Sequence, residues 1–208
     1  MEEVRLWKFE CWNEPNLPKN IFGSFWSGTK EEYFALYNAT AVALKHADSH
    51  LQVGGPATSG GGWLADFLTF VHGHSDSDKD SVSSAPSAHA VPLDFISTHH
   101  YPGTTGAGLE QLKECLKNDQ ALVQSLGFDL HTMQLSEYNS GLYERILPFH
   151  NHDTSYAGAF VATLLPRLSM EAIVEKQQIM SYWSFSDVFE EIYFDHEPFH
   201  DGFGLITI

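Results

Sequence analysis

The hydrophobic and polar positions of the chain alternate between short apolar runs and longer stretches with helical spacing. The apolar runs, which predict strands, are residues 4–12, 51–55, 93–99, 132–137 and 179–185. The amphipathic stretches, which predict helices, are residues 30–47, 63–71, 109–126 and 153–170. This alternation of strands and helices is typical of a parallel sheet covered by helices.

Two architectures satisfy this order of elements, a doubly wound open sheet and a (β/α)8 barrel. A doubly wound nucleotide binder has a Gly-rich turn after its first strand. The turn in this chain is Asn13-Glu14-Pro15-Asn16, which offers a carboxylate and no phosphate cradle. In barrels the chemistry lies at the carboxyl ends of the strands, which is where this chain has its unusual polar residues. The sequence therefore predicts an α/β chain of the (β/α)8 TIM-barrel class.

The predicted strands end in residues that suit the cleavage of a glycosidic bond. The first run leads into Glu14, the third into His99 and Tyr101, the fourth into Glu137, and the fifth holds Trp183. A parallel barrel brings these ends into one bowl, so the two glutamates can face each other. One carboxyl group must donate a proton to the leaving oxygen while the other stabilises or attacks the sugar carbon. A lone Glu at a strand end is usually a surface acid, but the combination favours a catalytic pair.

Four segments, in order along nearly the whole chain, resemble a known family. They are residues 12–16 (WNEPN), 51–57 (LQVGGPA), 136–139 (SEYN) and 181–191 (SYWSFSDVFEE). These segments resemble glycoside hydrolase family 39, whose members are β-xylosidases and α-L-iduronidases. The last segment is the most specific and is closer to the β-xylosidase branch, because iduronidases lack such a run.

The resemblance implies the roles of the two carboxylates. Glu14, after the fourth barrel strand, would be the general acid/base, and Glu137, at the end of the seventh, the nucleophile. Asn13 would hydrogen-bond the hydroxyl group next to the reacting carbon. The family retains the configuration of the sugar, so the two carboxyl groups should lie about 5–5.5 Å apart.

The resemblance also implies four residues that bind or position the substrate. His99 and Tyr101 match a His-x-Tyr motif of the sixth strand and would position the nucleophile and the sugar. Trp183, on the eighth strand, would form a platform under the sugar ring. Glu191 would bind sugar hydroxyl groups.

The predicted barrel is incomplete. A complete barrel has eight strands in about 250 residues, whereas this chain of 208 residues shows five apolar runs, which the resemblance numbers four to eight. We therefore expect residues 1–208 to be the C-terminal part of a barrel catalytic domain and the native gene product to be longer. Residues 72–92, rich in Ser, Asp and His, are expected to form a surface loop insertion. The open sheet would leave an unpaired edge strand, which favours self-association.

The charge and composition of the chain exclude several partners. Lys and Arg number 11 against 27 Asp and Glu, which gives a formal net charge of −16 at pH 7. Such an acidic chain disfavours nucleic acid and anionic membrane surfaces, and no apolar run is long enough to cross a bilayer. The Met1-Glu2-Glu3 start shows no secretory signal. A secreted or lysosomal location stays open for a longer protein.

The histidines and cysteines do not predict a metal site. The 12 His show neither a His-Glu-x-x-His spacing nor a pairing with Cys, so we expect no metal and no cofactor. Cys11 and Cys115 are too far apart in sequence for a zinc motif, and both are expected to be buried thiols.

The function that the sequence favours is hydrolysis of terminal β-D-xylosyl residues from xylo-oligosaccharides or other β-xylosides by double displacement. One alternative is an α-L-iduronidase-like hydrolase of glycosaminoglycans, and another is a catalytically inactive carbohydrate-binding fragment. Lys and Arg are scarce around the motifs, which favours a neutral sugar over the carboxylate of an iduronide.

Overall fold

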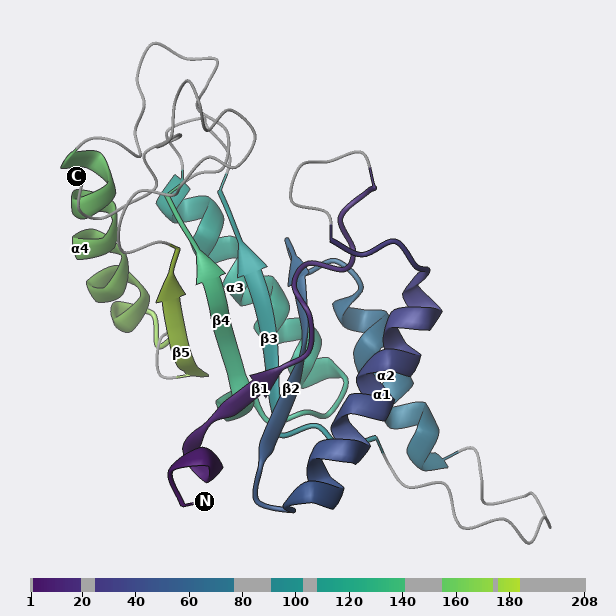
Figure 1. The fold of residues 1–208 in the computed structure, drawn as a ribbon. Helices are drawn as coiled ribbons and strands as arrows, with labels where there is room; N and C mark the ends of the chain where they lie inside the picture. Colours follow the sequence, from purple (N-terminus) through teal and green to yellow (C-terminus); the bar gives the residue numbers. More distant parts are fainter. Residues whose placement is uncertain are drawn as a thin grey trace, which may run out of the picture.

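The computed structural model of the chain describes residues 2–19, 25–76, 91–102, 108–140, 155–173 and 176–183 (Figure 1). The strands are β1 (Lys8–Glu10), β2 (Gln52–Ser59), β3 (Phe95–His100), β4 (Met133–Tyr138) and β5 (Gln177–Tyr182). The helices are α1 (Lys30–Ala47), α2 (Leu64–Asp76), α3 (Gly108–Ser125) and α4 (Ser155–Met170). Two short 3-10 turns complete the described elements, η1 (Glu3–Leu6) and η2 (Leu130–Thr132).

The five strands form one parallel sheet in the order β1-β2-β3-β4-β5. Each strand therefore pairs with the next strand along the chain, and a helix connects each pair, as parallel crossovers require. A doubly wound sheet would reverse its strand order at a switch point. The sequential order confirms the barrel type of winding that the sequence predicted.

A hydrogen bond between two distant strands shows that the sheet is strongly curled. Ser136 Oγ on β4 donates to Glu10 Oε1 on β1 over 2.6 Å, although β2 and β3 lie between these strands. Neighbouring strands are about 4.8 Å apart, so in a flat sheet β1 and β4 would be separated by roughly 14 Å. These two side chains cannot span that distance. The sheet therefore curves around a concave face, as one part of a barrel does.

The hydrophobic core lies between the opposite, convex face of the sheet and the helices (Figure 1). A first cluster joins α1 and α2 to β2 and β3, and includes Tyr33, Tyr37, Val53, Phe67 and Ile96. A second cluster joins α3 and α4 to β4, and includes Leu112, Leu116, Leu135, Phe160 and Leu164. Polar strand residues such as Ser136 and Glu10 are left on the concave face.

Helix α1 begins at a capping box. The Thr29 side chain accepts a hydrogen bond from the Glu32 backbone N–H, and the Glu32 carboxylate accepts one from the Thr29 N–H. One face of the helix carries Tyr33 and Tyr37, which are fully buried against the sheet. The structure confirms the predicted helix 30–47 at both ends.

The predicted strand at residues 4–12 is wrong in its first half. Glu3–Leu6 form the turn η1, and β1 is limited to Lys8–Glu10. Arg5 gives the physical reason, because its Nε lies 2.6 Å from Asp48 Oδ2, just beyond the end of α1. This ion pair ties the turn to the end of α1, and Leu6 is left exposed.

Other boundaries are shifted. β2 continues to Ser59, past the predicted end at residue 55, and β5 lies at Gln177–Tyr182 where the sequence predicted 179–185. Helix α2 continues to Asp76, so the expected loop at 72–92 begins inside a helix, and residues 77–90 lie outside the described part of the chain. No helix in the described ranges is long and apolar enough to cross a membrane.

Candidate active site

The candidate residues lie at the carboxyl ends of the strands. Glu14 follows β1, His99 and Tyr101 lie at the end of β3, Glu137 lies in β4, and Trp183 follows β5. Because the sheet is parallel and curled, these strand ends meet at one rim. The structure thus brings five of the predicted residues into a single site.

The imidazole of His99 lies between the two carboxylates. Its Nδ1 atom is 3.2 Å from Glu14 Oε1 and 3.5 Å from Glu137 Oε2. One oxygen of each carboxylate and one ring nitrogen of His99 all lie within 4.8 Å of one another. The side chain of His99 is 2% exposed, that of Glu14 13% and that of Glu137 21%. This burial strengthens the electrostatic coupling of the three groups.

An irregularity in β4 places Glu137 on the concave face. The register pairs Thr98 with Leu135 and then His99 with Glu137, so Ser136 is an extra residue in β4. With strict alternation Glu137 would share the convex face with Leu135, which packs in the second core cluster. A bulge of this kind re-aims the side chains that follow it. The bulge therefore turns Glu137 away from the helices and toward His99.

A second irregularity, in β2, anchors the turn that carries Glu14. The register pairs Pro56 with Ser97 and Thr58 with Thr98, so Ala57 is the extra residue. Its carbonyl oxygen accepts a hydrogen bond of 2.9 Å from the Glu14 backbone N–H. Glu14 itself has a φ of 42°, in the left-handed region that residues with a side chain rarely adopt. Each carboxylate of the pair is thus positioned by one bulge.

Two further contacts hold the Glu14 turn against β2. The Asn16 side chain donates to the Ser59 carbonyl and accepts from the Ser59 N–H, both over 2.9 Å. The Tyr33 hydroxyl lies 3.0 Å from the Cys11 carbonyl oxygen and 2.8 Å from the Pro56 carbonyl oxygen. The turn is therefore fixed on both sides of Glu14.

Aromatic side chains flank Glu137. The Tyr101 hydroxyl donates a hydrogen bond to Glu137 Oε1. The rings of Tyr101 and Trp183 meet edge to face, with centroids 6.5 Å apart. The Trp183 backbone is held by a 2.8 Å hydrogen bond from its N–H to the Tyr138 carbonyl. Tyr101 therefore contacts both Glu137, the candidate nucleophile, and Trp183, the candidate sugar platform.

The surroundings raise the pKa values of three groups in the site, each for different physical reasons. Burial alone would lower the pKa of His99, but the hydrogen bond with Glu14 and the negative charge of Glu137 outweigh burial and raise that pKa. Burial raises the pKa of Glu137, while the charge of His99 and the hydrogen bond from Tyr101 oppose the rise. Burial and the nearby Glu137 charge raise the pKa of Tyr101, so its hydroxyl remains a donor.

Sequence reasoning missed Glu10 and Ser136, which join β1 to β4 on the concave face beside the site. The negative charge of Glu10 contributes to the raised pKa of both His99 and Glu137. The available sign was the position of Glu10 directly before Cys11, because neighbouring residues in extended backbone face opposite sides and Cys11 packs in the core.

Glu14, His99 and Glu137 are also the residues, within the described ranges, that could hold a metal ion. Imidazole and carboxylate groups are ligands of several divalent cations. The hydrogen bond with Glu14 and the negative charge of Glu137 raise the pKa of His99, which favours its protonated form over metal ligation. The expectation of no metal stays a prediction.

Asn13 and Glu191 are the other two predicted site residues. Asn13 is exposed on the turn directly before Glu14. Glu191 lies outside the described residues, and its role stays a prediction.

The parallel, curled sheet and the acidic pair at its carboxyl rim place the chain among (β/α)8-barrel proteins. The family model of glycosyl hydrolases family 39 matches residues 1–208. The chain belongs to this family.

Three relatives illustrate the match. The chain is 36% identical to a β-xylosidase of Geobacillus stearothermophilus over 225 residues, which cover 100% of the chain and 39% of that protein. It is 36% identical to a β-xylosidase of Caldicellulosiruptor saccharolyticus over 217 residues, 99% of the chain and 38% of the relative. The crystal structure of a monomeric β-xylosidase from Caulobacter crescentus CB15 superposes with a TM-score of 0.75 at 30% identity, covering 100% of the chain and 39% of that structure. The chain thus resembles the β-xylosidase branch and spans about two fifths of each relative.

Proposed function

We propose that the chain carries the catalytic pair of a retaining glycoside hydrolase that removes terminal β-D-xylosyl residues from xylo-oligosaccharides or other β-xylosides. The observation that carries the proposal is the pair of carboxylates on either side of His99, with oxygens within 4.8 Å of each other. Retaining enzymes place their carboxyl groups about 5–5.5 Å apart, whereas inverting enzymes leave about 6.5–9.5 Å for a water molecule. The close approach of Glu14 and Glu137 supports retention.

In the proposed first step Glu14 donates a proton to the glycosidic oxygen while Glu137 attacks the anomeric carbon. The bond from the carbon to the leaving oxygen breaks, and an ester bond to Glu137 forms. In the second step Glu14 removes a proton from water, which attacks the same carbon and releases Glu137 as a carboxylate. Two inversions leave the configuration of the sugar unchanged.

The contacts of the two glutamates support this division of roles. Tyr101 donates a hydrogen bond to Glu137, and donors of this kind favour the charged form that a nucleophile needs. His99 contacts both carboxylates and so holds the donor and the nucleophile at a fixed separation. Fixed positioning of reacting groups contributes several kcal/mol to catalysis in general.

The charge of the site favours a neutral sugar. Glu14 and Glu137 both contact the imidazole of His99, and the negative charge of Glu10 also raises the pKa of that ring. The contacts that the structure gives these three acids include no Lys or Arg. The carboxylate of an iduronide would meet repulsion there. Two relatives of the chain are named β-xylosidase, which agrees with this preference.

Hydrolysis of an aryl β-xyloside, measured beside an aryl α-L-iduronide, tests the proposal. The 208-residue chain should cleave the xyloside at least about tenfold faster than the iduronide, a difference of about 1.4 kcal/mol in transition-state binding. Glu137→Gln should abolish cleavage of a xyloside with any leaving group. Glu14→Gln should leave the rate of the first step unchanged when the leaving group is an acidic phenol such as dinitrophenol, because its anion leaves without a proton.

A matched acid away from the site provides the control for these variants. Glu171 lies after α4 and forms ion pairs with Lys113 and Lys117, so Glu171→Gln should leave the rate unchanged. Faster cleavage of the iduronide would overturn the substrate assignment. Binding of xylose without turnover would instead support an inactive carbohydrate-binding protein.

A further inference from the structure

The backbone of Trp183 is held at both of its polar groups by the two residues that follow Glu137. The Trp183 N–H donates a 2.8 Å hydrogen bond to the Tyr138 carbonyl, and the Trp183 carbonyl accepts a hydrogen bond from Asn139 Nδ2. Tyr138 ends β4 and Trp183 directly follows β5, so these two contacts continue the pairing of the two strands past their ends. The strand that carries the candidate nucleophile therefore also fixes the position of Trp183.

The side-chain amide of Asn139 is held in one orientation. Its Oδ1 atom accepts hydrogen bonds from the Ser140 N–H, from Ser140 Oγ over 3.1 Å and from the Tyr182 hydroxyl over 3.0 Å. Three donors on the oxygen turn the Nδ2 group toward the Trp183 carbonyl, because an amide nitrogen donates and does not accept. Asn139 is fully buried, and a buried polar contact is costly to lose.

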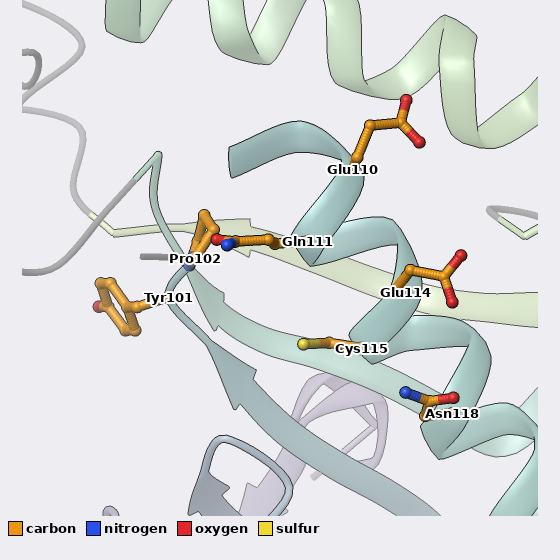
Figure 2. A pocket seen from close by; sticks show the side chains of 7 residues that line it. All are labelled: Tyr101, Pro102, Glu110, Gln111, Glu114, Cys115 and Asn118. Atoms are coloured by element: carbon orange, nitrogen blue, oxygen red, sulfur yellow. The ribbon is translucent and has the colours of Figure 1, made fainter. Parts of the chain in front are cut away.

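The Tyr101 side chain is turned away from a neighbouring pocket. This pocket, of about 440 Å³, lies between the end of β3 and helix α3 (Figure 2). Tyr101 is among its lining residues, but its ring points away from α3. Cys115, on α3, also lines the pocket and is half-buried, which corrects the expectation that both cysteines are buried. The ring of Tyr101 instead meets the ring of Trp183, and its hydroxyl donates to Glu137. A single aromatic side chain therefore connects the Trp183 indole to the candidate nucleophile.

We propose that Asn139 is a positioning residue for sugar binding, which holds the Trp183 indole at the place relative to Glu137 where the sugar ring of the substrate packs. This inference rests on the proposed function, in which a neutral xylosyl ring binds beside Glu137. The C–H groups of such a ring pack on the flat apolar face of an indole. Asn139 acts through Trp183, and a shift of about 1 Å in a positioning group can cost up to about a hundredfold in rate.

A purely structural role for Asn139 would be limited to joining the ends of β4 and β5. It predicts a less stable protein that binds the sugar as well as the wild type does. Positioning of Trp183 predicts weaker binding of the sugar in a protein that is still folded. Urea unfolding of each variant separates the loss of stability from the loss of binding.

The contacts of Asn139 supply a variant and a matched control. In Asn139→Asp one carboxylate oxygen still accepts from Ser140 and Tyr182, but the other faces the Trp183 carbonyl without a hydrogen to donate. Ser140→Ala removes the Oγ donor to the same Asn139 oxygen and leaves the contact with Trp183 intact. Asn139→Ala, which buries no charge, replaces Asn139→Asp if that protein does not fold.

The first readout is steady-state hydrolysis of an aryl β-xyloside with xylose as a competitive inhibitor. Xylose fills only the sugar position, so its inhibition constant reports binding there. Asn139→Asp should raise KM and the inhibition constant of xylose by about tenfold and leave kcat within about threefold, because the lost contact serves ground state and transition state alike. Ser140→Ala should stay within about twofold of the wild type in all three. A lower kcat with an unchanged xylose constant, or equal constants in the two variants, overturns the proposal.

The second readout does not need turnover. The five Trp of the 208-residue chain are replaced with 5-fluorotryptophan, and the fluorine signal of Trp183 is assigned from its absence in Trp183→Phe. Asn139→Asp should move this signal and Ser140→Ala should not. Xylose should shift the signal in the wild-type chain and require about tenfold more sugar in Asn139→Asp. If the wild-type chain binds xylose in this way but cleaves no xyloside, the proposed hydrolysis fails and the role of Asn139 stands. A Trp183 signal that xylose does not shift, or that Asn139→Asp does not move, overturns that role.

Discussion

The hydroxyl group of Tyr33 gives a quantitative test of how the Glu14 turn is held. This group is fully buried and lies within hydrogen-bond distance of two backbone carbonyl oxygens, those of Cys11 and Pro56. Tyr33→Phe keeps the ring and creates no cavity, so only the polar contacts change. A hydrogen bond contributes about 1 kcal/mol net, and leaving buried acceptors without their donor adds about 1–3 kcal/mol. We expect a loss of about 2 kcal/mol in the free energy of unfolding, or roughly 4–8 °C in Tm.

Tyr37→Phe is the matched control. Tyr37 is also fully buried, lies one turn further along α1, and donates a single 2.9 Å hydrogen bond to the Pro92 carbonyl. Its loss should cost about 1 kcal/mol. Because Pro92 precedes β3 and is far in sequence from the Glu14 turn, this variant should not disturb the catalytic pair.

The two variants are compared by urea unfolding and by kcat on an aryl β-xyloside. Tyr33→Phe should lower kcat by about tenfold, since small displacements of a catalytic group can cost up to about a hundredfold. Tyr37→Phe should leave kcat within a factor of about two. Equal kcat values for both variants, or a Tyr33→Phe protein as stable as the wild type, would refute the role given to Tyr33.

Three other substitutions test separate parts of the structure. Tyr101→Phe removes a donor to Glu137 and so raises its pKa, and the acidic limb of the kcat/KM profile should move up by about one to two pH units; an unmoved limb would contradict the contact. His100 Nε2 lies 2.6 Å from Asp119 Oδ2, and this contact helps to raise the pKa of His100 to about 9. The pair therefore stabilises the folded state fully below about pH 6.5, and this stability is lost as the pH rises through 9. Urea titrations should show the unfolding free energy falling by up to about 3 kcal/mol over that window, and Asp119→Asn should flatten the fall. Leu116→Ala empties a fully buried position and should cost about 2–5 kcal/mol by the same urea assay, with a loss below about 1 kcal/mol contradicting the packing.

The helical part of the fold was predictable because its determinants are local. Helix α1 buries Tyr33, Tyr37 and Ala41 at helical spacing and begins at a capping box formed by Thr29 and Glu32, so its signals lie within a few residues of one another. The first strand was predicted too long because Arg5 pairs with Asp48, a contact between residues far apart in sequence. No local pattern contains such a contact.

The candidate site was predicted from its residue types but not from its geometry. The acid-bearing turn at Glu14 and the polar ends of the other strands pointed to a shared rim, and the structure brings those residues together. The two bulges, at Ala57 and Ser136, were not predictable, because each breaks the period of two on which strand prediction depends. Strict alternation at Ser136 would have sent Glu137 to the helical side. Glu10 was missed because its partner on β4 is brought near only by the curl of the sheet.

The measurement that tests the central claim most directly is mass spectrometry of the 208-residue chain after reaction with a 2-fluoro-β-xyloside that has a good leaving group. Fluorine at the carbon next to the reacting centre slows both steps by opposing positive charge there, and the leaving group restores only the first, so a covalent intermediate accumulates. The account predicts one added fluoroxylosyl group, located on the peptide that contains Glu137 and absent from Glu137→Gln. A label on Glu14 instead, or turnover of an ordinary aryl β-xyloside that releases α-xylose first, would contradict it.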